Sequence, residues 1–160
     1  MSRVVVNEIQ AKVGNDISFN DAAKIDTLKG KTTAGSITVQ GEGTNTTNLQ
    51  QGLAKAWVNF DGTTVDGTVD LTGVRDSFNI SAIVDGGTGD YRIDINADMN
   101  STDYVVVGSG YDHAGTADTY TVHMYHDLAA GSVEINNVRP TNNASSDTSY
   151  IGTTIHGDLA

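Results

Sequence analysis

The 160-residue sequence predicts an all-β protein on three observations. First, apolar and polar residues alternate over short segments in the later two thirds of the chain, as in strands that bury one face. Second, clusters of Gly, Asp and Asn separate these segments roughly every ten to fifteen residues. Third, no long segment repeats its apolar residues with the helical period. We therefore expect a β-sandwich or jelly-roll-like module.

The composition changes near residue 50, which predicts two regions. Phe19 is the only aromatic residue before Trp57. Residues 1–55 carry six Lys/Arg and five Asp/Glu, which gives a net charge of +1. Residues 56–160 carry three Lys/Arg and fifteen Asp/Glu, which gives a net charge of −12. A segment with few large apolar side chains cannot offset the entropy lost on ordering. We predict that residues 1–50 form an extended, β-rich attachment and trimerisation segment, and that residues 51–160 form an exposed β-sandwich module.

The first region consists of short extended pieces between turn residues, of which GSITVQG (35–41) is an example. Disorder is the alternative for this region. GEGTNTTN (41–48) has the composition of a flexible linker. The following LQQGLAKA (49–56) could form a helical turn, but Gly52 interrupts it. We interpret it as the lead-in to a strand at 55–60.

Trp57 is the most informative residue of that strand. Ala56, Val58 and Phe60 share one face by strand alternation, which places Trp57 on the other. That second face is covered by core, by another subunit, or serves as a sugar platform. Because tryptophan is favoured in the centres of interfaces, Trp57, together with Phe19, is predicted to lie at the subunit interface.

Further strands are predicted from alternation and from one continuous apolar run. Tyr104–Val107 is the continuous run, which is typical of a strand buried on both faces. DGGTGD (85–90) separates two alternating segments and predicts a hairpin connection. The residues expected to share a face within each remaining strand are Phe78, Ile80, Ala82 and Val84; Tyr91, Ile93, Ile95 and Ala97; Tyr120, Val122 and Met124; and Val133 with Ile135.

Several classes of protein are disfavoured by composition. The chain has no cysteine, so it can form neither a disulfide framework nor a thiolate zinc site. An acidic surface repels phosphate backbones, so we expect no nucleic-acid partner. No segment approaches the ~18 consecutive apolar residues of a membrane span, and the start of the chain does not resemble a signal peptide. We expect synthesis in a cytoplasm and no membrane insertion.

No sequence motif indicates a particular enzymatic reaction. His123 and His126 fall on opposite faces of a strand, which does not suit a shared metal ion. The acidic loops 61–70 and 85–90 resemble calcium loops in composition, but lack their spacing. The G-x-G at 108–110 is not followed by a helical pattern, so it does not predict a dinucleotide site. We expect no enzymatic activity, no cofactor and no metal site.

One loop combines features that suit a small polar ligand. In GSGYDHAGTAD (108–118), Tyr111 offers an aromatic face, Asp112 and His113 offer polar groups, and glycines permit close approach. These three residues are the candidate receptor or glycan contact, and an ordinary solvated turn is the alternative.

The blocks GLAKAWVNFDGT (52–63), VRDSFNIS (74–81) and DGGTGDY (85–91) follow one another along the chain. In this order they resemble a module of virion appendage, tail-fibre-like proteins of marine tailed bacteriophages. The resemblance covers most of residues 50–108 in ordered blocks, and residues 1–40 more loosely. The other blocks that carry it are Met99, YVVVG (104–108) and, near the start of the chain, VNEIQAKVGNDISF (6–19). The segment 61–73 looks longer than its counterpart in the family, and no long repetitive shaft is present.

The resemblance implies a β-rich, homotrimeric structural protein on the surface of a phage particle, with no catalytic residues. Its partners would be further copies of itself, other virion proteins and, through the exposed module, a glycan of the host cell surface. Since the chain lacks a shaft, the resemblance does not decide between a tail-fibre-like and a head-fibre position. The alternatives are a capsid decoration protein without a receptor and an isolated carbohydrate-binding module.

Overall fold

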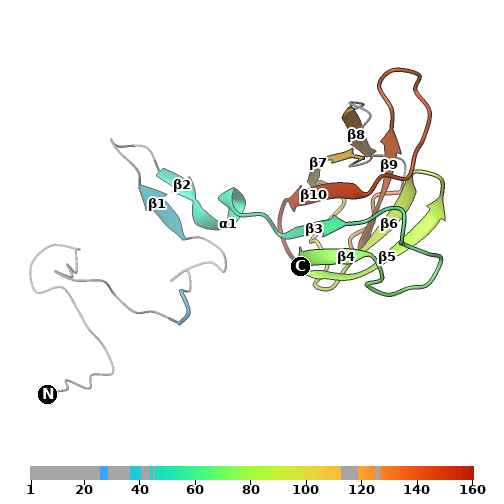
Figure 1. The fold of residues 1–160 in the computed structure, drawn as a ribbon. Helices are drawn as coiled ribbons and strands as arrows, with labels where there is room; N and C mark the ends of the chain where they lie inside the picture. The colour runs from blue at the N-terminus through green and yellow to red at the C-terminus, as the bar shows by residue number, and fades with distance from the viewer. Residues whose placement is uncertain (1–25, 29–36, 41–43, 45, 113–118, 125–126) are drawn as a thin grey trace, which may run out of the picture.

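The computed structural model describes residues 26–28, 37–40, 44, 46–112, 119–124 and 127–160. Its strands form two separate antiparallel sheets (Figure 1). The predicted all-β fold class is confirmed. The sequence-predicted residues Phe19, His113 and His126 lie outside the described residues, so the expectations that rest on them stay predictions.

The smaller sheet pairs β1 (Thr38–Gln40) with β2 (Thr46–Asn48), and a single helical turn, α1 (Leu49–Gly52), follows. The larger sheet has eight strands in the order β4-β3-β10-β7-β8-β9-β6-β5, with every neighbouring pair antiparallel. Its strands are β3 (Ala56–Phe60), β4 (Val74–Phe78), β5 (Ile80–Gly87), β6 (Asp90–Ile95), β7 (Val105–Tyr111), β8 (Thr119–Met124), β9 (Ser132–Val138) and β10 (Tyr150–His156).

A single residue, Asn79, joins the two ends of the larger sheet. β4 and β5 are the outermost strands of the sheet order, yet only Asn79 separates them in sequence, so the sheet curls back on itself (Figure 1). Asn79 has a φ of 59°, in the left-handed region that asparagine tolerates better than most residues. Its side-chain amide donates to the carbonyls of Lys55 and Ala97 at 3.0 and 3.1 Å, and its Oδ1 accepts from the Ala97 amide at 2.8 Å. The corner is thereby fixed to both halves of the sheet.

Because the sheet curls, one apolar core forms between its halves. Phe60 of β3 contacts Tyr91 of β6 edge to face, with ring centroids 5.1 Å apart. Alternation places the core residues correctly in three strands: β3, β6 and β9 each show strict buried and half-buried alternation. The buried apolar side chains are Ala56, Val58, Phe60, Val65, Ile80, Ala82, Ile83, Tyr91, Ile93, Ile95, Met99, Tyr104, Val133, Ile135, Ile151 and Ile155. The halves thus stack in a sandwich-like manner.

The hairpin predicted at DGGTGD joins β5 to β6. Gly87 and Gly89 both have positive φ, at 136° and 70°. Gly89 is also constrained by space, because a Cβ there would lie 2.6 Å from the Ser146 nitrogen and 2.7 Å from the Asn137 carbonyl oxygen. Only glycine fits such a position.

The long segment between β3 and β4 covers the outer edge of β5. The amide of Ile83 donates to the Asp70 carbonyl, and that of Asp85 to the Asp66 carbonyl, both at 2.8 Å. The segment is shaped by three Asx turns, in each of which an Asp side chain accepts from the amide two residues on. The pairs are Asp61 with Thr63, Asp66 with Thr68 and Asp70 with Thr72. Pairing of this kind protects a sheet edge from other chains.

Two strand predictions are wrong. Phe78, Ile80, Ala82 and Val84 do not share a face. The corner at Asn79 divides the segment into two strands, and a register shift between Ile80 and Ala82 reverses the alternation within β5. Phe78 is 53% exposed, whereas Ile80 is buried. The run Tyr104–Val107 is not buried throughout either. Tyr104 is buried, but Val105 and Val107 are 60% and 57% exposed, because they point away from the core along β7.

Two smaller expectations also need correction. Part of the predicted linker, Thr46–Asn48, is β2, and the following LQQG forms the helical turn α1 rather than only a lead-in to β3. Ala97, expected on the buried face with Tyr91, lies beyond the end of β6 and is exposed.

Replacement of Asn79 by glycine tests the corner. Glycine accepts the positive φ but removes three hydrogen bonds, so the free energy of unfolding should fall by about 2–3 kcal/mol. Asn143→Gly is the matched control, because Asn143 has a φ of 58° and is exposed. It should change stability by no more than about 0.5 kcal/mol. Urea unfolding of both variants measures the difference, and equal effects would show that the Asn79 side chain does not hold the corner.

Candidate functional site

The candidate site is the outer face of the half-sheet β4-β3-β10-β7, here called the Trp57 face. Its side chains point away from the core because they alternate with buried residues on each strand. As predicted, Trp57 lies on the face opposite Ala56, Val58 and Phe60. The outward residues are Phe78 and Asp76 of β4, Trp57 and Asn59 of β3, Tyr150, Gly152, Thr154 and His156 of β10, and Val105, Val107, Ser109 and Tyr111 of β7.

The strand registers align these residues in rows. One row runs across all four strands as Phe78, Trp57, Thr154 and Val107. Register places Phe78 directly opposite Trp57, and Val107 directly opposite Thr154, so the side chains of each pair are neighbours on this face. Val105 extends the apolar area beside Val107, opposite His156. The result is a band with two apolar groups, Phe78 with Trp57 and Val105 with Val107, which lie on either side of Thr154 and His156 of β10.

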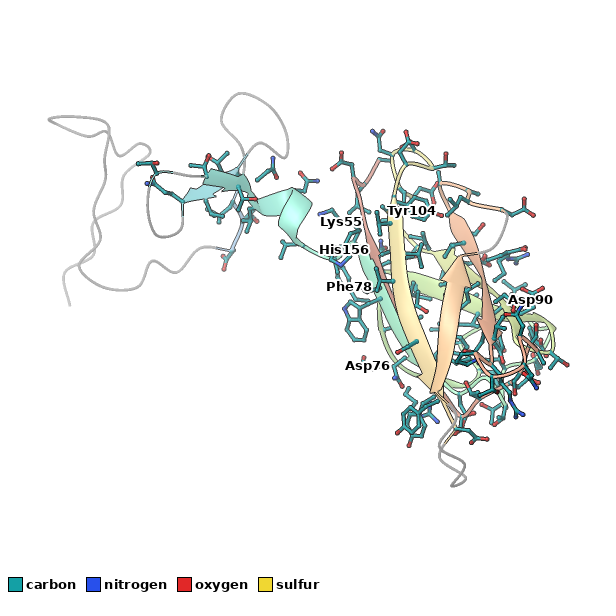
Figure 2. The ribbon with its side chains drawn as sticks, turned by 90° about the horizontal axis from the view of Figure 1, so that it is seen from above. Lys55, Asp76, Phe78, Asp90, Tyr104 and His156 are labelled. Carbon is teal, nitrogen blue, oxygen red and sulfur yellow. The ribbon has the colours of Figure 1, made fainter. Side chains whose placement is uncertain are left out.

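Charge is nearly absent from this band. The next row, Asp76, Asn59, Gly152 and Ser109, holds a single carboxylate, on the edge strand β4. Figure 2 shows Phe78, Asp76 and His156 along one side of the module. By contrast, fifteen acidic residues against three arginines make the chain after residue 55 strongly negative. The Trp57 face is therefore a weakly charged surface on an acidic domain.

A ladder of stacked side chains ends the face at Tyr111, the last residue of β7. The rings of Tyr111 and Tyr150 are nearly parallel, with centroids 4.8 Å apart. The guanidinium of Arg75 lies 4.1 Å from the centroid of Tyr150, and its Nη2 forms an ion pair with Asp61 at 2.9 Å. Stacking on both sides of Tyr150 orders three long side chains at one surface.

The structure brings together some of the predicted site residues. Tyr111 is 49% exposed within the ladder, and the Ser149 hydroxyl donates to Asp112 at 3.1 Å. Trp57 lies at the other end of the same face. The sequence-based prediction missed Phe78, Val105 and Val107, as well as Arg75 and Tyr150. A sequence signal for the exposure of Val105 and Val107 exists. Val106, Gly108 and Gly110 alternate with them along β7, and the two glycines are closely packed, so Val105 and Val107 fall on the opposite face of the strand.

Tyr91 is the most perturbed titratable group among the described residues, and its pKa is raised first by burial and then by hydrogen bonding to Asp147. Its hydroxyl lies 2.8 Å from Asp147 Oδ1 and 3.1 Å from the Gly62 carbonyl oxygen, while the Gly89 amide donates to the same carboxylate at 2.6 Å. These contacts tie three loops together inside the fold, so we assign the cluster a structural role.

In the described part of the chain, no group of three or more His, Asp or Glu side chains is placed to hold a metal ion. Nor is any helix in those ranges long and apolar enough to cross a membrane. No protein-family model, no curated protein and no solved structure matches this chain. The candidate site therefore rests on its geometry.

Alkaline pH should destabilise the fold through its buried tyrosines. Burial raises the pKa of both Tyr91 and Tyr104 above the ordinary value of about 10. The stabilisation linked to a raised tyrosine pKa is complete below the unfolded value and is lost as the pH rises through the folded value. The free energy of unfolding, measured by urea denaturation, should therefore decline above pH ~10.

The variant Tyr91→Phe isolates this contribution. It should cost about 1–2 kcal/mol at neutral pH, because a buried hydrogen bond is removed, and should show a shallower alkaline decline than the parent. Tyr111→Phe, at an exposed tyrosine, is the control and should decline like the parent. A Tyr91→Phe chain with the parent's full alkaline decline would contradict the assignment.

Proposed function

We propose that this chain is a structural protein of a bacteriophage particle, a tail-fibre-like or head-fibre appendage. Its first region attaches to other virion proteins, and the β module is displayed on the outside of the particle. The resemblance of residues 52–63, 74–81, 85–91 and 104–108 to appendage modules supports this proposal. The strongly negative module would also remain soluble outside the particle.

The Trp57 face is the observation that carries the proposal. Exposed Phe78, Val105 and Val107 lie on the same outer face as the half-buried Trp57, and apolar side chains gathered on one face are characteristic of a surface that contacts another protein. Aromatic residues are enriched, and charged residues depleted, at the centres of interfaces. The band fits assembly better than catalysis, since no polar cluster converges on it.

In the proposed assembly, the partner at the apolar part of this face, around Trp57 and Phe78, is another copy of the chain, and the end of the face at Tyr111 stays uncovered. The resemblance implies a homotrimer, the strand pattern of the sequence predicts jelly-roll-like modules, and Trp57 is the proposed central interface residue. Three modules on one attachment point would also contact a host surface together. Multivalent binding raises avidity by about 10²–10⁴ over one site without new contacts.

A second role, contact with a host-surface glycan, is favoured by the ladder. Stacking on Tyr150 holds the Tyr111 ring in one orientation, and Tyr111 remains 49% exposed. A fixed, exposed aromatic ring beside polar groups is suited to a sugar, because the ring packs on C–H groups while the polar groups accept hydrogen bonds. Asp112 is the nearby acceptor, and His113 follows it in sequence.

Removal of the Trp57 side chain should weaken assembly. Sedimentation equilibrium of the parent should give a trimer at micromolar concentration, and Trp57→Ala should reduce the association free energy by about 2–4 kcal/mol, the range of an interface hot spot. Val69→Ala is the control, since Val69 is 64% exposed but lies in the segment that covers β5. A folded monomer in the parent would refute the proposed assembly.

Truncation of Tyr111 and His113 tests the glycan role separately. The double variant Tyr111→Ala, His113→Ala should remain assembled, because Tyr111 lies outside the two apolar groups of the band. In assembled particles, the two truncations together should weaken receptor binding by about 1.4 kcal/mol, so adsorption to host cells should fall roughly 10-fold. Val69→Ala particles provide the control. Unchanged adsorption of the double variant would rule out this loop as the receptor contact.

A further inference from the structure

The segment before β3 is a folded element without a core of its own. It comprises β1, β2, α1 and Leu53, and is here called the arm. All three residues of β1 and the first two of β2 are exposed. Isolated two-stranded hairpins are marginally stable in water, so the arm needs a surface against which to pack. Its own module does not provide one, because Figure 1 shows the arm standing away from the eight-stranded sheet.

A buried lysine ties the end of the arm to the start of β3. Lys55 is 4% exposed, and its ammonium group donates to the carbonyls of Gln50 and Leu53, the latter at 3.2 Å. A buried ammonium group is costly unless it is hydrogen-bonded, so these contacts hold α1 at the start of β3. In Figure 2, Lys55 lies between the helical turn and the sheet. The arm is thus held outward rather than folded over its own Trp57 face.

The arm and the Trp57 face are complementary in character. Val39 and Leu53 are 39% and 55% exposed, and the chain from residue 37 to 54 contains one charged residue, Glu42. The Trp57 face likewise carries few charges: the Asp76 carboxylate on its edge strand, and the Arg75–Asp61 ion pair at the end formed by the ladder. Copies of a chain with a net charge of −11 repel each other most where their carboxylates meet. An almost uncharged arm can approach an almost uncharged face without that cost.

We propose that the arm of one copy packs on the Trp57 face of the next copy, with Val39 and Leu53 contacting the band around Phe78 and Val107. This inference rests on the proposed self-assembly and names the element that covers the face. The contact is heterologous, because an arm meets a face rather than a second arm. Such contacts close into rings when the rotation between copies permits, and a trimer is one such ring.

Single-cysteine cross-linking of the full chain tests the arrangement cleanly, because the native chain has no cysteine. Val39→Cys copies are mixed with Val107→Cys copies that carry a mass tag, the mixture is allowed to exchange subunits, and it is oxidised. The arm–face disulfide should be the main product. Docked cysteines experience millimolar effective concentrations, so the product should exceed random collision by about 10²-fold.

The control replaces the face variant by Val69→Cys. Val69 and Val107 are both exposed valines, at 64% and 57%, but Val69 lies outside the Trp57 face. Val39→Cys with Val69→Cys should give only the collisional background. A strong cross-link to Val69→Cys would overturn the proposal, because the arm would then lack a preference for the face.

Sedimentation of the same samples separates this inference from the proposed function. An oligomer in which Val107→Cys forms disulfides mainly with itself would overturn arm exchange, yet would leave self-assembly through the Trp57 face intact. A parent chain that is monomeric at every concentration would overturn both. A trimer with the predicted arm–face disulfide supports both.

Discussion

The arrangement of this protein depends on the corner at Asn79. An eight-stranded antiparallel sheet that stayed open would expose one apolar face along its whole length. The left-handed backbone at Asn79 turns β4 directly into β5, the strand at the far end of the sheet order, so the inner faces of the two halves meet. The side chain then binds Lys55 before β3 and Ala97 after β6. Closure buries the inner faces, and only the outer faces remain available to partners.

The two strand edges and the outer face around Trp57 differ in how well they suit contact with another protein. The edge of β5 is paired with the segment that contains Asp66 and Asp70. The opposite edge, β4, carries the charged residues Arg75 and Asp76, which discourage edge-to-edge pairing. Association through the strand edges is therefore disfavoured. Contact through the apolar residues around Trp57 releases water from apolar groups at a small electrostatic cost, because this face carries few charges.

Alternation predicts the all-β class and the buried faces of β3, β6 and β9, because each of these strands has one core face and one outer face. Alternation gives wrong assignments where a segment does not have one core face and one outer face along its whole length. The left-handed backbone conformation at Asn79 leaves no trace in the pattern of apolar residues, so alternation groups Phe78 with the buried Ile80. A run of valines fits either face, so the exposure of Val105 and Val107 is not visible in their hydropathy. The ladder of Arg75, Tyr150 and Tyr111 joins three strands distant in sequence, and only the sheet register brings them together.

In the proposed assembly the Trp57 face is covered by another copy, and the chain contains its own probe of that contact. Trp57 is the only tryptophan, so intrinsic tryptophan fluorescence reports on this face alone. The measurement is the Trp57 emission maximum and its quenching by acrylamide across a dilution series. Coverage by another copy predicts blue-shifted, protected emission at micromolar concentration that becomes red-shifted and quenchable on dilution. Emission that is fully quenchable and independent of concentration, in a chain that remains folded, would contradict it.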